Sequence, residues 1–75
     1  TPEQQNLFRL LKLWRKGKAT ELDMPAFVIF GDKTLRDLAQ RKPSTLEDLA
    51  GIYGIGEAKI EKLGAELLQE IKNAQ

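Results

Sequence analysis

The sequence predicts an all-α protein, a compact bundle of about five helices with a helix-hairpin-helix-like turn. Apolar residues recur at spacings of three and four along most of the 75 residues. The one short apolar run that reads equally well as a strand has no second strand to pair with. Two glycines, Gly54 and Gly56, separate the last two helical segments. This length holds one small domain, over residues 1–75.

The first helix has a clear start signal. Thr1 is a good N-cap, Pro2 suits the first helical position, and Gln4 stands where a capping box needs it. Gly17 predicts the end of this helix, and the pattern dissolves into a loop over 19–25. Its apolar face, which we expect in the core, carries Leu7, Leu10, Leu11 and Trp14.

The middle of the chain begins with the ambiguous run 27–30. Periodicity cannot separate a buried strand from a helical turn over four residues, and the missing partner strand favours the turn. Asp32 is the expected N-cap of the next helix, which Pro43 closes. The inward residues of that helix are Leu35, Leu38 and Ala39.

Two further helices complete the bundle. Ser44 and Glu47 predict a capping box before a short helix whose apolar side holds Leu46, Leu49 and Ala50. The last helix has an apolar stripe with Gly64 on the same side, where a neighbouring helix can approach closely. The stripe consists of Ile60, Leu63, Leu67 and Ile71.

The composition argues against catalysis and against a metal or cofactor site. There is no Cys and no His, so thiolate chemistry, the commonest general base and most zinc sites are absent. The carboxylate pairs Glu47–Asp48 and Glu57–Glu61 lack further convergent acids. We therefore expect no enzyme activity, no metal and no cofactor.

The ends and the hydropathy of the chain indicate its setting. No apolar run approaches the roughly 20 residues of a membrane span, and no signal peptide is visible. We expect a cytoplasmic protein, associated with the nucleoid if bacterial, that is monomeric in isolation and has no membrane partner. The chain opens on a helix cap rather than Met, so we expect a fragment of a longer protein, although removal of an initiator Met would look the same.

Charge is distributed unevenly although the net charge is only +1. Residues 1–22 hold five basic and two acidic side chains, and the remainder holds seven basic and nine acidic ones. Arg9, Lys12 and Lys16 share the face opposite the apolar one. A basic end of this kind is a footprint of nucleic-acid binding, but a solvated helix face has the same pattern.

The glycine turn offers a second candidate contact. Glycines permit backbone angles that a Cβ forbids, and the amides around Gly56 are left bare for a phosphate beside Lys59. Glu57 and Glu61 stand among these groups and would repel it. A tight turn between packed helices, without any ligand, explains the glycines equally well.

The order of these segments resembles an HRDC domain, the helicase-and-RNase-D C-terminal module. The resemblance covers nearly the whole chain and rests on 26–30, 32–35, Pro43, the Gly54-Ile55-Gly56 turn and 59–64. It implies a five-helix accessory module that guides substrate selection for a RecQ-type DNA helicase and performs no catalysis itself.

The resemblance also implies a DNA-binding surface of basic residues near the end of the first helix and an aromatic residue after it. Phe27 occupies the aromatic position, where family members known for DNA contact have Tyr. It would stack on an unpaired base, unless its ring packs in the core. The predicted nucleic-acid-binding residues are Lys12, Arg15, Lys16, Lys18, Phe27, Gly54, Gly56 and Lys59.

The sequence leaves three functions open. The first is weak binding of single-stranded or branched DNA, and the second is docking on the parent helicase core or another repair protein to regulate the helicase. The third is RNA binding for an RNase D-like nuclease. Tyr53 is either exposed at the hairpin tip or packed on the first helix.

Overall fold

The computed structural model describes all 75 residues and contains five helices and no strand. This confirms the predicted all-α bundle. The helices are α1 (Pro2–Leu22), α2 (Ala26–Ile29), α3 (Asp32–Arg41), α4 (Leu46–Leu49) and α5 (Glu57–Asn73).

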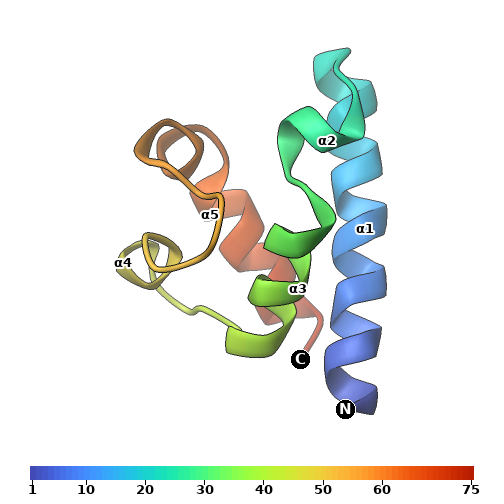
Figure 1. The fold of residues 1–75 in the computed structure, drawn as a ribbon, viewed down its shortest axis with the longest axis vertical. Coiled ribbons are helices and arrows are strands. Elements are labelled where there is room, and N and C mark those ends of the chain that lie inside the picture. Colours follow the sequence, from blue (N-terminus) through green and yellow to red (C-terminus); the bar gives the residue numbers. More distant parts are fainter.

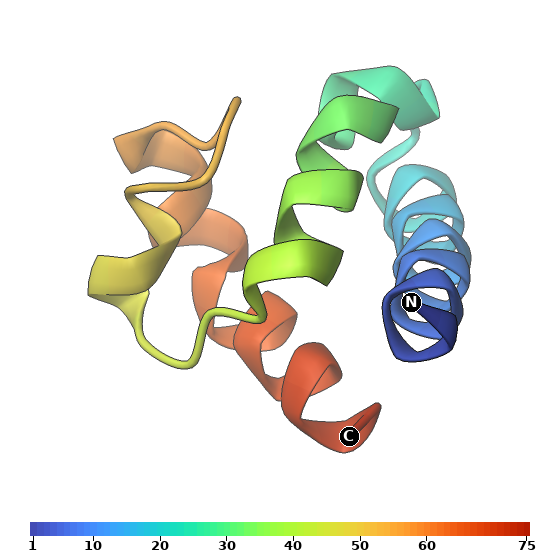
Figure 2. The ribbon, with the colours of Figure 1, turned by 60° about the horizontal axis from the view of Figure 1, so that its bottom comes forward.

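The long helix α1 forms one side of the molecule, and α3 runs back along it in the opposite direction (Figure 1). The short helix α2 makes the connection between them at one end. The pair α4 and α5 lies beyond α3, with α5 also reaching α1 (Figure 2). The two termini meet at the same end of the bundle, where Glu3, Lys42 and Gln75 line a common hollow.

Helix α1 starts as predicted but ends five residues later. The amide of Gln4 donates to Thr1 Oγ1 at 3.2 Å and the Gln4 side chain accepts from the Thr1 amine, which is the capping box. The prediction that Gly17 ends the helix and that 19–25 form a loop is wrong. The helix continues to Leu22 and stops at Asp23, whose φ is 54°. Burial of Ala19 in the core offsets the roughly 1 kcal/mol that a glycine costs within a helix.

The helical turn at 27–30 is confirmed as α2, and the core side of α3 is buried as predicted. The N-cap of α3 is Gly31 and not Asp32, which is the first helical residue. The reason is that the Asp32 carboxylate is bound by Arg15 instead of by the amides of its own helix. Helix α3 ends at Arg41, two residues before Pro43, as expected from the proline.

The predicted capping box of Ser44 and Glu47 is wrong. Thr45 is the N-cap of α4 and accepts from the amide of Asp48 at 3.0 Å, while the Asp48 carboxylate accepts from the amide of Ser44, the residue before the cap. Of the apolar side only Leu49 is buried, while Leu46 is half exposed and Ala50 is exposed. A helix of four residues has too little length to bury a whole apolar face.

The stripe of α5 faces the core as predicted, with Gly64 buried on the same side. A Cβ at Gly64 would lie 2.8 Å from a methyl group of Leu46, which confirms the close helix approach. Trp14 was expected in the core but is only partly buried, stacked on Phe30 with a ring separation of 6.3 Å. The core consists of Leu7, Leu11, Ala19, Ile29, Phe30, Leu35, Leu38, Ala39, Leu49, Ile52, Ile55, Leu67 and Ile71.

Candidate nucleic-acid interface

A basic groove follows the outer face of α1. It has a volume of about 620 Å³ and ends at Ala26, the residue before Phe27. No acidic side chain lines it. The lining residues are Arg9, Lys12, Leu13, Arg15, Lys16 and Ala26. Amphipathic spacing explains this arrangement, since the core takes the opposite face of the helix.

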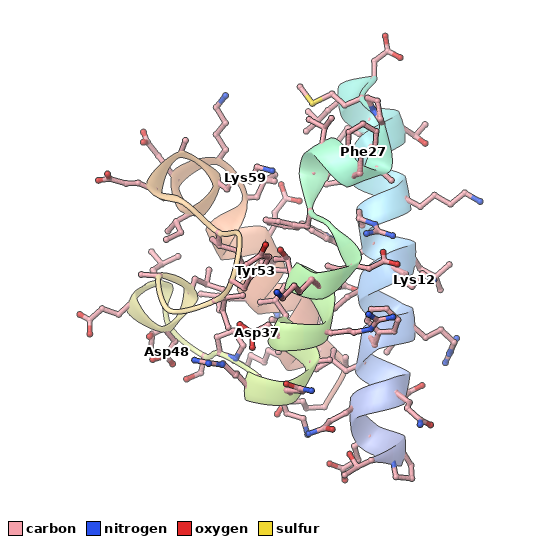
Figure 3. All side chains as sticks on the ribbon, viewed as in Figure 1. Lys12, Phe27, Asp37, Asp48, Tyr53 and Lys59 are labelled. Atoms are coloured by element: carbon pink, nitrogen blue, oxygen red, sulfur yellow. The ribbon has the colours of Figure 1, made fainter.

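Phe27 is the most exposed large apolar side chain in the molecule, at 76%. The interpretation of Phe27 as a core residue is therefore wrong. The α2 turn directs Ile29 into the core, with Phe30 buried after it, which leaves Phe27 on the outer side. Figure 3 shows its ring at the α2 end of the bundle, beside α1.

Arg15 was predicted to contact phosphate, but its guanidinium is already occupied. The side chain is only 12% exposed, donates to the carbonyl of Phe30 at 2.9 Å and pairs with Asp32 at 2.8 Å. The Arg15 hydrogen bond lowers the pKa of the Asp32 carboxyl. Arg15 thus joins α1 to the connection between α2 and α3.

Lys18 is occupied as well. Its ammonium lies 2.5 Å from a Glu21 carboxylate oxygen and 2.6 Å from one of Glu66, and the side chain is 10% exposed. The hydrogen bond with Glu21, followed by that with Glu66, raises the pKa of Lys18. This side chain connects the end of α1 to α5.

Lys59 reaches from α5 to the end of α2 and makes no ion pair. Its ammonium donates to the carbonyls of Val28, at 2.5 Å, and of Ile29, and it lies 5.1 Å from the centre of the Phe30 ring. Together with the Arg15 bond to Phe30, three successive carbonyls at the end of α2 are bound by cations. Two residues predicted as phosphate ligands therefore hold the short helix that presents Phe27.

The two glycines of the turn have different roles. Gly54 has a φ of 77°, and a Cβ there would collide with the hydroxyl of the buried Thr34. Gly56 is the N-cap of α5 in extended backbone, and a Cβ there would meet nothing within 4 Å. The expectation that both positions need glycine is right only for Gly54. The start of α5 carries no side-chain cap, in agreement with the predicted bare amides.

Tyr53 lies beside α3 and not against α1. It is 57% exposed, its amide donates to Asp37 at 2.9 Å, and the Lys33 ammonium sits 4.4 Å from the ring centre. Figure 3 shows Tyr53 and Asp37 close together. Of the two positions considered from the sequence, the exposed one is confirmed.

The remaining predicted cations, Lys12 and Lys16, are exposed and form no ion pair, and Arg9 bonds only the Asn6 amide oxygen. Two further free cations on α3, Lys33 and Arg36, were missed from the sequence. Their spacing of three residues places them on one helix face, and this spacing could have identified them. They were overlooked because the second half of the chain has a net negative charge.

No group of three or more acidic, His or Cys side chains is placed to hold a metal ion. The helices are also too short or too polar for any of them to span a bilayer.

The geometry defines a small helical module with a basic groove and two exposed aromatic rings, those of Phe27 and Tyr53. Residues 4–71 match the HRDC domain family. The chain is 40% identical over 93% of its length to the ATP-dependent DNA helicase RecQ of Bacillus subtilis and 38% identical over 91% to the ATP-dependent DNA helicase UvrD2 of Mycobacterium tuberculosis. It also superimposes on HRDC domain 3 of D. radiodurans RecQ with a TM-score of 0.89, at 37% identity, covering 93% of this chain and 92% of that one.

The chain belongs to the HRDC domain family. It spans only 12% of the B. subtilis helicase and 10% of the M. tuberculosis one, and the matched part is an accessory domain rather than the catalytic one. The predicted family, the helical fold and the accessory character are therefore confirmed.

Proposed function

We propose that this domain binds single-stranded or partly unpaired DNA weakly and thereby guides substrate selection by a RecQ-type helicase. One observation carries the proposal: Phe27, whose ring is exposed, directly follows Ala26, which lines a groove with four basic side chains and no acidic one. An aromatic face stacks on any unpaired base, and lysine and arginine neutralise phosphates without reading sequence.

The binding is expected to be weak and moderately salt-dependent. Arg9, Lys12 and Lys16 are the groove cations without a carboxylate partner, since Arg15 is paired with Asp32. Three neutralised phosphates give a log–log salt slope of about −2 on a single strand. A domain tethered to a helicase gains from effective concentration, so weak intrinsic affinity is sufficient.

The test is a titration of the domain with a short single-stranded oligonucleotide at 50 mM salt, followed by NMR and by fluorescence anisotropy. We expect Phe27→Ala to lower the affinity at least about fivefold through lost stacking. Lys16→Gln should lower the affinity about eightfold. One phosphate contact contributes about 0.7 to the log–log slope, which corresponds to about eightfold in affinity at 50 mM salt relative to 1 M. Lys72→Gln, an exposed lysine on α5, is the matched control and should bind like the wild type.

The residues whose NMR signals shift on addition of DNA show where the DNA binds. Shifts on α1 and Phe27 support the proposal, whereas shifts confined to Gly54–Lys59 would move the contact to the hairpin. No shift at millimolar DNA would refute it. A matching RNA oligonucleotide tests the RNase D-like alternative, which requires tighter binding of RNA than of DNA.

A second function, docking of a protein partner, is favoured by an apolar groove on another face. Leu22, Met24 and Val28 are each more than 40% exposed and line a hollow of about 580 Å³ against Leu63. Docking on the parent helicase would use this groove. It predicts that Met24→Asp disrupts helicase function while leaving oligonucleotide binding by the domain unchanged.

A further inference from the structure

A second aromatic ring with free cations lies further along α1. Phe8 is partly buried at the edge of the core, and two cations from different helices stand over it. The ammonium of Lys12 is 5.4 Å from the ring centre and the guanidinium of Arg36, from α3, is 5.5 Å away. Both distances are within the range of a cation–π contact.

These two cations have no carboxylate of their own. Neither Lys12 nor Arg36 takes part in an ion pair, and both side chains are exposed. Both cations act on the charge of Asp32, which is balanced by Arg15 at 2.8 Å. The pKa of Asp32 is lowered chiefly by the Arg15 hydrogen bond and further by the positive charges of Lys12 and Arg36. The local field is therefore positive and available to an anion.

The ring also borders a polar hollow between α1 and α3. This hollow has a volume of about 200 Å³, and its lining contains no acidic residue. Amide side chains there can donate to and accept from a base edge, while an aromatic or guanidinium plane can stack on the base. The lining includes Gln4, Gln5, Phe8, Arg36 and Gln40.

We propose that Phe8, Lys12 and Arg36 form a second nucleotide subsite, which takes an unpaired nucleotide next to the α1 groove. Lys12 belongs to both, because it lines the groove and its ammonium lies over the Phe8 ring. Phe8 precedes Arg15, at the Phe27 end of the groove, by seven residues, which is about 10 Å along the helix. About three stacked nucleotides cover that distance. The inference rests on the proposed DNA binding and extends its surface from α1 onto α3.

The experiment compares two arginines of α3 that differ in their surroundings. Arg36→Gln removes a free cation at the subsite, and Arg41→Gln removes one that is paired with Asp37 on the same helix. The change in net charge is identical, so a general electrostatic effect lowers the affinity of both variants equally. Affinity for a labelled oligothymidylate is measured by anisotropy between 50 and 200 mM salt, with thermal melting to verify the fold.

We expect Arg36→Gln to weaken binding about eightfold at 50 mM salt and to make the log–log slope shallower by about 0.7. Arg41→Gln should stay within about twofold of the wild type. Phe8→Leu keeps an apolar side chain against the core and removes the stacking face, so it should weaken binding without changing the salt slope.

Equal losses in the two arginine variants would overturn the subsite. Wild-type affinity of Arg36→Gln, together with weaker binding by Phe27→Ala, would also overturn it but leave the proposed function intact. If the wild-type domain does not bind the oligonucleotide, the proposed function and the subsite fail together.

Discussion

Replacement by alanine should be costly at one turn glycine, Gly54, and nearly neutral at the other, Gly56, although the sequence presents the two as equivalent. Gly54 has a φ of 77°, where a side chain costs about 1–2 kcal/mol. Its new Cβ would also collide with the buried Thr34 hydroxyl, and overpacking of this kind costs about 1–3 kcal/mol. Together these effects predict that Gly54→Ala lowers the free energy of unfolding by about 2–5 kcal/mol.

Gly56→Ala is the matched control. Its backbone is extended, and the added methyl group meets no atom within 4 Å. The reduced entropy of the unfolded chain stabilises the variant by about 0.4–1 kcal/mol, which offsets the loss of a good N-cap residue. We therefore expect a change within about 0.5 kcal/mol.

Thermal and urea unfolding, followed by fluorescence of the single tryptophan, Trp14, measure both effects. In a domain of this size 1 kcal/mol shifts Tm by about 4–8 °C, so Gly54→Ala should melt at least about 8 °C below the wild type. Equal stability of the two variants would refute the reasoning. Removing the colliding hydroxyl with Thr34→Ala should make the additional cost of Gly54→Ala smaller than in the wild type.

Three further predictions concern stability. Leu38→Ala, at a side chain with no exposed surface, should cost about 2–5 kcal/mol in urea unfolding; a cost below 1 kcal/mol would contradict the core assignment. Asp32→Asn should melt below the wild type at pH 7, and the difference should shrink below about pH 4. Because the pKa of Asp32 is lower in the folded state, its stabilising effect is present above the unfolded-state pKa and is lost as the pH falls through the folded-state pKa. A difference in Tm between the variant and the wild type that stays constant down to pH 2 would argue against the Arg15 pair. Gly64→Ala should change the free energy of unfolding by no more than about 1 kcal/mol. The Leu46 methyl group that its Cβ contacts ends a half-exposed side chain that can move, and alanine favours the helix. The bulkier Gly64→Val should be clearly destabilising.

The sequence was sufficient for most of the fold because the signals involved are local. The capping box of α1 needs only Thr1 and Gln4, and the buried side of α3 follows from spacings of three and four residues. The predictions from sequence were wrong where contacts between distant residues outweighed the local signals. Gly17 did not end α1, because the following residues pack on the core and Lys18 reaches Glu66 on α5.

The candidate site was predictable only in part. The basic face of α1 and the position of Phe27 could be found from the sequence. The outward direction of the Phe27 ring could not, because a run of apolar residues does not show which of them a four-residue helix turns towards the core. The α3 cations beside Phe8 and Tyr53 were missed for a similar reason, since nothing local connects Lys33 and Arg36 to rings on other segments.

The sequence by itself determined that this chain is a helical HRDC module with a basic first helix. Only the tertiary structure decided which basic residues are free to meet a ligand. Arg15, Lys18 and Lys59 looked equivalent to Lys12 and Lys16, yet their charges are bound by Asp32, Glu66 and the carbonyls of α2. The partners of a charge are chosen by folding across distant parts of the chain, whereas the periodicity that forms a helix is set by its nearest neighbours.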